Sequence, residues 1–273
     1  MKWQKEFGEY FHNNIMSLIK TKDDIKKMRE GGKILSVALA AVVKAVRPGV
    51  NIRELDEIAE TTLRTAGAVP SFKGFRSSKQ DPPFPSTICI SIGPELVHGT
   101  ANRDIKLKEG EIVSLDIGCE YKGCFTDMAI TVPVGEISEE AKKLMQITHD
   151  SLFAGVRAVK AGGDVRNISA AIDGFIKPFG YGIVTALVGH GVGHAVHEEP
   201  AIPNFLSSQA KSFPIKAGMC LAIEPMIAAG SGEVVTADDG WTVITKDKSL
   251  AAHFEVTVVI TEKGHEILTP FPL

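Results

Sequence analysis

Two stretches of the chain, 113 residues apart, share one order of apolar and polar positions. Each has apolar side chains at helical spacing, then a glycine-containing turn, then a second periodic run: V-R-P-G-V-N-I-R-E-L (46–55) and V-K-A-G-G-D-V-R-N-I (159–168). Asn51 and Asp164 stand where a helix N-cap accepts backbone hydrogen bonds. Both stretches therefore predict helix, turn, helix. The apolar positions of the two leading helices are Ile34, Val37, Ala38, Ala41 and Val42, and Leu144, Ile147, Leu152 and Val156.

A second pattern repeats later in each half, with the composition of strands. L-K-E-G-E-I-V-S-L-D (107–116) matches I-K-A-G-M-C-L-A-I-E (215–224), and both end an apolar strand with a carboxylate. A looser pair opens strands with a carboxylate: Phe125–Asp127 before M-A-I-T-V, and His253–Glu255 before V-T-V-V-I. Because the matches keep the same order, they predict two related α/β halves, each with two carboxylates on strands.

The segment 111–134 predicts two strands joined by a tight turn within residues 121–123. If the first two of these three residues form the turn, Asp116 and Asp127 face each other across the ladder. If the last two form it, the carboxylates lie one diagonal apart. Both registers put them on one face, about 5–8 Å apart at their Cβ atoms.

Buried carboxylates this close repel one another, so a shared proton or a cation must lie between them. Glu224 and Glu255 repeat the arrangement in the second half. Asp116 and Glu224 have apolar sequence neighbours, which disfavours the alternative of a solvated strand edge. That alternative stays open for Asp127 and Glu255 taken alone. Four acids converging in one core favour metal over shared protons.

Between the second helix pair and the last strands, V-G-H-G-V-G-H-A-V-H-E-E-P (188–200) holds three histidines. His190 and His194 have the spacing of a helical zinc site, but the glycines around them disfavour a helix. A histidine bracketed by glycines on an extended segment suits a place where the backbone approaches a ligand. His190 and His197 are therefore candidate site residues, and His98, in E-L-V-H-G, is another. The histidines left without a role are His12, His149, His253 and His265.

Oxygen-rich ligands with a single imidazole suit Mn, Fe, Co or Zn. Five ligands, four of them carboxylates that can bridge, fit two ions better than one. A pair of ions about 3.5–4 Å apart can hold a hydroxide and polarise a carbonyl, which is the chemistry of a hydrolase with peptide bonds as an obvious target. The candidate metal ligands are Asp116, Asp127, His190, Glu224 and Glu255.

Composition changes this picture little. The chain has 273 residues, a formal charge of −3, 44% hydrophobic and 23% charged residues, as expected for a globular protein of one large or two small domains. Without an acidic or basic tract, we expect no binding of nucleic acid or of a membrane surface. No apolar run reaches the ~18 residues of a membrane span, and no signal peptide is evident, so a cytoplasmic protein is expected. Buried reduced thiols are expected at Cys89, Cys119, Cys124 and Cys220.

The five candidate ligands, in this order, resemble the metal ligands of the methionine aminopeptidases, and the resemblance extends from about Ile19 to Thr269. It implies the pita-bread fold, an α+β fold with pseudo-twofold related halves around a central antiparallel sheet. It also implies a dimetal hydrolase that removes the initiator methionine from nascent polypeptides, preferring a small second residue. The motifs are P-S-F-K-G (70–74), V-H-G (97–99), G-H-G-V-G-H-A-V-H-E-E-P (189–200), I-E-P-M (223–226) and D-G-W-T (239–242).

The resemblance also implies a role for each metal ligand. Asp127 and Glu255 would bridge two divalent ions, which could be Co, Mn, Fe or Zn. His190 and Glu224 would complete one metal site, and Asp116 would chelate the other ion. Glu224 would in addition carry protons for the attacking water.

On the substrate side, the resemblance implies that His98 and His197 contact the substrate and stabilise the tetrahedral intermediate. Aromatic side chains would line the pocket for the methionine side chain. For the phenylalanines among them, ordinary core packing is the alternative. The aromatic residues are Phe72, Phe75, Phe84 and, packed close by, Trp241.

The chain departs from the family pattern at three places. R-S-S-K-Q-D-P-P (76–83) is inserted between Phe75 and Phe84, where the family usually has a very short link. Val196 stands where a bulky aromatic residue is frequent. Val256 replaces a histidine that is common after the last glutamate.

Residues 1–15 precede the family's usual start at Met16, which predicts an N-terminal extension (1–15) and one catalytic domain (16–273). The expected partners are the N-termini of nascent polypeptides, with ribosome contact left open, and a monomer is the default. One alternative is an Xaa-Pro aminopeptidase or dipeptidase of the same fold, which C-F-T-D-M (124–128) also resembles. The H-E-E-P and D-G-W-T motifs favour the methionine branch. A non-catalytic peptide-binding protein is the other alternative, disfavoured by the retention of all five ligands.

Overall fold

The computed structural model describes residues 18–76, 82–207 and 209–272. The structure contains two helix pairs, one in each half, as the repeat predicts. Asn51 and Asp164 cap the second helix of each pair, and each side chain accepts a backbone N–H two residues further on. The predicted helix–turn–helix repeat is thereby confirmed. The helices are α2 (Lys22–Ala45), α3 (Ile52–Thr65), α4 (Glu139–Arg157) and α5 (Val165–Ile176), followed by the short 3₁₀ helix η2 (Lys177–Phe179).

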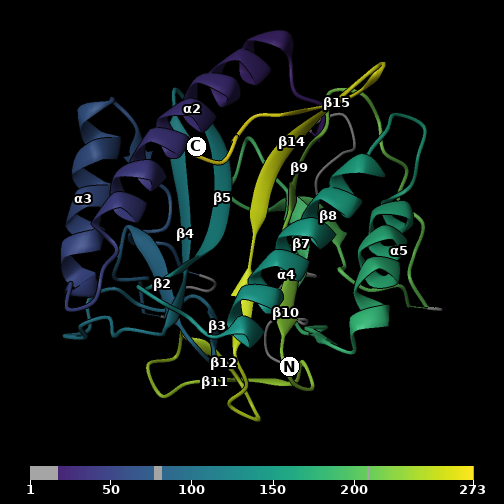
Figure 1. The fold of residues 1–273 in the computed structure, drawn as a ribbon. Helices are drawn as coiled ribbons and strands as arrows, with labels where there is room; N and C mark the ends of the chain where they lie inside the picture. The colour runs from purple at the N-terminus through teal and green to yellow at the C-terminus, as the bar shows by residue number, and fades with distance from the viewer. Residues whose placement is uncertain (1–17, 77–81, 208, 273) are drawn as a thin grey trace.

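A nine-stranded sheet forms the centre of the molecule (Figure 1). Its main path is β1-β4-β5-β14-β9-β7-β8, with β2 paired to β4 and β15 paired to β14, and all of these pairings are antiparallel. The strands of the first half are β1 (Val69–Pro70), β2 (Ile88–Ile92), β4 (Ile112–Tyr121) and β5 (Cys124–Pro133). Those of the second half are β7 (Gly189–Gly191), β8 (Glu198–Ile202), β9 (Cys220–Ile223), β14 (Glu255–Thr261) and β15 (Gly264–Ile267).

Two three-stranded sheets complete the described structure, with the orders β13-β10-β6 and β11-β12-β3. The first consists of β6 (Gly182–Ile183), β10 (Met226–Ala228) and β13 (Ala251–His253). The second consists of β3 (Glu95–Val97), β11 (Val234–Thr236) and β12 (Val243–Thr245).

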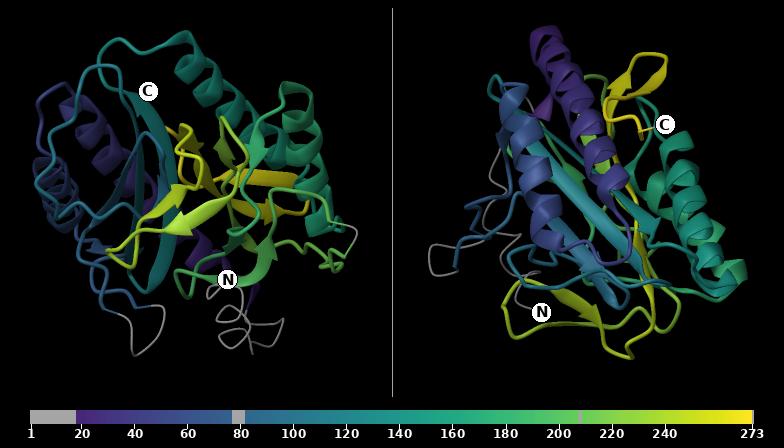
Figure 2. Two further views of the ribbon diagram at one scale, coloured as in Figure 1. Left: turned by 90° about the horizontal axis from the view of Figure 1, so that it is seen from below. Right: turned by 60° about the vertical axis from the view of Figure 1, so that its left-hand side comes forward.

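The four helices lie along one side of the large sheet, α2 and α3 over the first half and α4 and α5 over the second (Figures 1 and 2). The main apolar core fills the space between helices and strands. Leu35 and Leu39 of α2 are fully buried there with Leu115 of β4, Met128 of β5 and Val258 of β14. This burial holds the halves together through the central strands β5 and β14, so the predicted α+β architecture with a central antiparallel sheet is confirmed.

The hairpin β4–β5 takes the second of the two predicted registers. Lys122 and Gly123 form the turn, with φ angles of 53° and 82° that favour glycine at one of the two positions. Asp116 therefore pairs with Ala129, while Asp127 pairs with Gly118, one diagonal away. The prediction that both repeated acids end their strands is wrong for Asp116, because β4 continues for five residues beyond it.

The four cysteines are free and buried, as expected. Among the described helices, none has the length and apolar character needed to cross a bilayer. The predicted extension 1–15, the start at Met16 and His12 lie outside the described residues, as does most of the insertion 76–83.

Candidate metal centre and active site

The sheet brings the four predicted carboxylates together from strands of both halves. Asp116 and Asp127 come from the hairpin β4–β5, and Glu224 directly follows β9. Glu255 begins β14, which pairs with β5 on one side and β9 on the other. All four side chains are buried, with at most 9% of any residue exposed.

His190 enters the same site from β7, where it pairs with Ala222 of β9. Its Nδ1 lies 2.8 Å from the carbonyl oxygen of Gly191, so Nδ1–H donates there and Nε2 is left facing Glu224, 3.4 Å from Oε1. The flanking glycines permit close strand packing rather than a ligand's approach. A Cβ on Gly189 would lie 2.6 Å from the Ala222 oxygen, and one on Gly191 would lie 2.0 Å from the Glu199 oxygen.

Burial of four acids in one place raises the pKa of each carboxyl group. The pKa of Asp127 rises to about 7 because of desolvation. For Asp116, Glu224 and Glu255, burial and then the neighbouring carboxylates raise the pKa well above the usual range. The described ion pairs give Glu224 and Glu255 imidazole partners only.

The donor set fits a divalent metal. Oδ1 of Asp116, Oδ1 of Asp127 and Oε1 of Glu255 are buried without a hydrogen-bond partner among the described residues. Such atoms are costly unless a cation or proton occupies the space between them. Asp127, His190 and Glu255 can each offer a ligand atom within 4.8 Å of the others. The four carboxylates and His190 therefore fit the predicted metal-binding role.

Sequence reasoning missed one member of the cluster, His253. Its Nε2 lies 3.4 Å from Oε2 of Glu224 and 4.0 Å from Oε2 of Glu255, and its pKa is lowered to about 3, first because of burial. The signal was present in the repeat H-F-E, since residues two apart on an extended chain point to the same side. The motif was interpreted for its carboxylate alone.

A cavity of about 350 Å³ opens at the metal cluster, and all eleven predicted site residues line it. None of its lining residues comes from α2, α3, α4 or α5. Burial lowers the pKa of His98 to about 4 and that of His197 well below its usual value, so both present neutral imidazoles. His98 has φ 58°, a left-handed conformation that costs a non-glycine residue about 1–3 kcal/mol and is common at functional sites.

Aromatic side chains form one wall of the cavity. The rings of Phe84 and Trp241 meet edge to face at 5.3 Å, and Phe75 packs on His197 at 5.4 Å. Asp239 accepts the backbone N–H of Trp241 at 2.9 Å, so the turn of D-G-W-T places the indole. Further lining residues, to which sequence reasoning gave no role in the site, include Arg76, Phe125, Leu187, Val188 and Met226.

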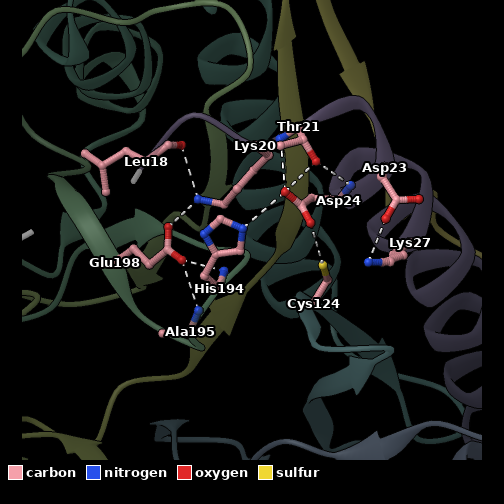
Figure 3. Close-up of polar contacts among 10 residues, drawn as sticks. All are labelled: Leu18, Lys20, Thr21, Asp23, Asp24, Lys27, Cys124, His194, Ala195 and Glu198. Atoms are coloured by element: carbon pink, nitrogen blue, oxygen red, sulfur yellow. Dashed lines mark hydrogen bonds and ion pairs between the residues drawn. The ribbon is translucent and has the colours of Figure 1, made fainter. Parts of the chain in front are cut away.

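The segment between His190 and His197 is tied to the start of α2 (Figure 3). Glu198, buried and adjacent to His197, accepts the backbone N–H groups of His194 and Ala195 on one oxygen. Its other oxygen pairs with Nζ of Lys20 at 2.5 Å, and this amino group also donates to the Leu18 carbonyl. This buried ion pair fixes the loop that carries part of the cavity wall.

Comparison with known proteins agrees with this geometry. A family model described as metallopeptidase family M24 matches residues 26–262. The chain is a member of this family. Methionine aminopeptidase 1 of Bacillus subtilis (strain 168) is 43% identical over 93% of this chain and 99% of its own length. The methionine aminopeptidase of Clostridium acetobutylicum is 42% identical with the same coverage.

Solved structures extend the likeness to the fold. A methionine aminopeptidase from Thermotoga maritima has a TM-score of 0.87 and 37% identity, covering 92% of this chain and 98% of its own. The prolidase from Pyrococcus furiosus has a TM-score of 0.76 and 26% identity, but only 66% of its chain is covered. The pita-bread class and the methionine aminopeptidase branch of this M24 protein are thereby confirmed.

Proposed function

We propose that the protein is a metal-dependent aminopeptidase that hydrolyses the peptide bond after an N-terminal methionine. The observation that carries this is the cavity itself, in which four buried, mutually repelling carboxylates and His190 adjoin an aromatic wall. The methionine aminopeptidases to which the chain is 42–43% identical cover almost its whole length. A preference for a small second residue and a cytoplasmic location are part of the proposal.

The five residues Asp116, Asp127, His190, Glu224 and Glu255 would hold two divalent ions. Asp127 lies where β5 pairs with β14, and its N–H donates to the Thr257 hydroxyl at 3.0 Å while its carbonyl accepts from it at 2.8 Å. These two hydrogen bonds fix β5 against β14. When bound, the ions would polarise the scissile carbonyl and lower the pKa of water.

The remaining steps belong to side chains of the chain. Glu224 accepts a proton from the attacking water and delivers it to the leaving amine, because its carboxylate faces the cavity between the imidazoles of His190 and His253. His98, which follows β3, and His197, which precedes β8, both line the cavity and bind the substrate carbonyl and main chain. Phe72, Phe75, Phe84 and Trp241 enclose the methionine side chain and exclude water from it.

The test compares two peptides, one beginning Met-Ala and one beginning Ala-Pro, on metal-stripped protein with Mn or Co restored. Release of methionine from the first alone, and only with metal, is the expected result. Cleavage of the second alone would assign the protein to the Xaa-Pro peptidases. Inactivity on both, with metal bound, would leave a peptide-binding protein.

A further inference from the structure

His253 is a buried imidazole to which neither the sequence motifs nor the proposed mechanism assigns a role. Its side chain is 2% exposed, and both ring nitrogens are without a hydrogen-bond partner in the part of the chain that the structure describes. An unsatisfied buried polar group costs about 1–3 kcal/mol. A ring with two such nitrogens inside a ligand cluster therefore points to a partner that is not a protein hydrogen-bonding group.

The backbone fixes the direction of this ring. His253 pairs with Met226 of β10, two residues beyond Glu224, and it precedes Glu255 by two residues. Its N–H donates to the Thr131 hydroxyl at 2.9 Å, and the same hydroxyl donates to its carbonyl at 2.9 Å. Because both main-chain groups of His253 are held by one side chain of β5, the imidazole has little freedom to leave the cluster.

The distances from the two imidazoles to Glu224 are those expected between ligand atoms of one metal ion. His190 Nε2 lies 3.4 Å from one oxygen of Glu224, and His253 Nε2 lies 3.4 Å from the other. Two ligand atoms bound about 2.0–2.1 Å from one ion at tetrahedral angles are about 3.4 Å apart. Glu224, His253 and Glu255 can moreover each offer a ligand atom within 4.8 Å of the others.

We propose that His253 is a sixth protein ligand of the dimetal centre, binding through Nε2 the ion that Glu224 and Glu255 hold. The proposal rests on the dimetal centre proposed above. A second imidazole makes the ligand set richer in nitrogen. It therefore favours Zn or Co over Mn relative to the five-ligand set.

The experiment compares the full-length protein with His253→Gln, each loaded with Co(II). Glutamine keeps an amide donor toward Glu224 but removes the imidazole, so it preserves a purely hydrogen-bonding role and abolishes ligation. X-ray absorption should count two imidazoles per two ions in the original protein and one in the variant. Calorimetry should show metal binding weakened by more than the about 10- to 100-fold that follows the loss of a hydrogen-bonding partner of a ligand.

His265→Gln is the matched control. This histidine lies on β15, with Nδ1 3.2 Å from the Val159 carbonyl and outside the cavity lining. Its replacement should leave both the imidazole count and the metal affinity unchanged.

A single imidazole in the original protein would overturn the proposal, whatever the variant does, and that measurement does not depend on the variant's folding. Unchanged affinity and imidazole count in His253→Gln would overturn it as well. Methionine release is measured separately on the unsubstituted protein. If the protein releases no methionine but X-ray absorption counts two imidazoles, the proposed function is wrong and the assignment of His253 as a ligand still holds.

Discussion

Carboxylates are buried at two neighbouring places in this protein, at Glu198 and in the cavity. Each place must offset the cost of burying negative charge, and the two do so differently. At the start of α2, the carboxylate of Glu198 is neutralised by Lys20 and by two backbone N–H groups (Figure 3). In the cavity, Asp116, Asp127 and Glu255 each keep a buried oxygen without a hydrogen-bond partner among the described residues. Protein groups alone therefore neutralise Glu198, whereas the cavity carboxylates need a proton or a cation.

Charge buried at Glu198 serves the structure of the loop, and charge buried in the cavity serves the binding of a ligand. A buried ion pair with its hydrogen bonds satisfied fixes a conformation, and breaking it costs stability. A cluster of unneutralised carboxylates costs stability in the folded protein until a cation binds. Substitutions in the two regions should therefore act in opposite ways on metal-free stability.

Asp127→Ala tests the cavity and should have the largest effect. Loss of this proposed metal ligand should lower methionine release by about a thousandfold or more, since metal-ion catalysis supplies several kcal/mol. In metal-free protein the same change removes one repelling carboxylate, so the melting temperature should stay equal or rise. Activity, metal content and thermal unfolding measure these outcomes together. A fully active variant would refute the ligand assignment.

Lys20→Met tests the other region. It leaves the Glu198 carboxylate buried and unpaired, which should lower the free energy of unfolding by about 3–5 kcal/mol with metal absent or present. Urea denaturation measures this loss. The double variant Lys20→Met/Glu198→Gln should recover most of it, because the amide oxygen still accepts the two loop N–H groups. A single-variant loss below about 1 kcal/mol would show that the pair does not hold the loop.

The pH dependence of metal binding sharpens the comparison further. Burial raises the pKa of Asp127 to about 7, so below pH 7 protons compete with metal for this group. Metal affinity should therefore fall by up to about tenfold per pH unit from this carboxyl alone as pH drops from 7 toward 4. Calorimetric titrations at several pH values measure the slope. Asp127→Asn should make it shallower, and an unchanged slope would contradict the assignment of the proton to Asp127.

The sign for folding stability is the reverse. With its pKa raised above the unfolded value, protonated Asp127 favours the folded, metal-free protein below about pH 4, and this contribution is lost as pH rises to about 7. Burial lowers the pKa of His190 to about 4, which destabilises the folded state as pH falls below about 6.5. The other three carboxyl groups act in the same direction as Asp127, and the other buried imidazoles in the same direction as His190. Because these two sets of contributions oppose each other, metal affinity is the cleaner measurement.

The sequence allowed the repeated helices, the hairpin and the convergence of four carboxylates with His190 to be predicted, because each depends on local patterning or on a motif. Asn51 and Asp164 cap their helices through contacts two residues away. The choice between two hairpin registers was open, since either kept Asp116 and Asp127 on one face. The turn at Lys122-Gly123 decides it.

His253 and the Lys20–Glu198 pair were not predicted, for different reasons. The spacing of H-F-E places His253 on the same side as Glu255, a signal that the interpretation of the motif passed over. Its approach to Glu224, in contrast, depends on the pairing of β13 with β10, which is tertiary structure. Lys20 and Glu198 are 178 residues apart, and neither lies in a charge pattern that suggests burial. Long-range pairings of single side chains leave little trace in one sequence.

The smallest predicted effect concerns a second contact between α2 and the loop that Glu198 holds, the contact between Asp24 and His194. His194 Nε2 lies 3.3 Å from Oδ2 of Asp24, but the His194 side chain is 45% exposed. The pKa of Asp24 is lowered to about 2 chiefly by the Thr21 hydroxyl in the capping box, and His194 contributes less. His194→Ala should therefore cost only about 0–1 kcal/mol in urea denaturation, and less at high salt. A loss of unfolding free energy as large as that of Lys20→Met would mean that the exposed His194–Asp24 contact holds the loop as firmly as the buried Lys20–Glu198 pair. Burial would then not explain the difference between the two contacts.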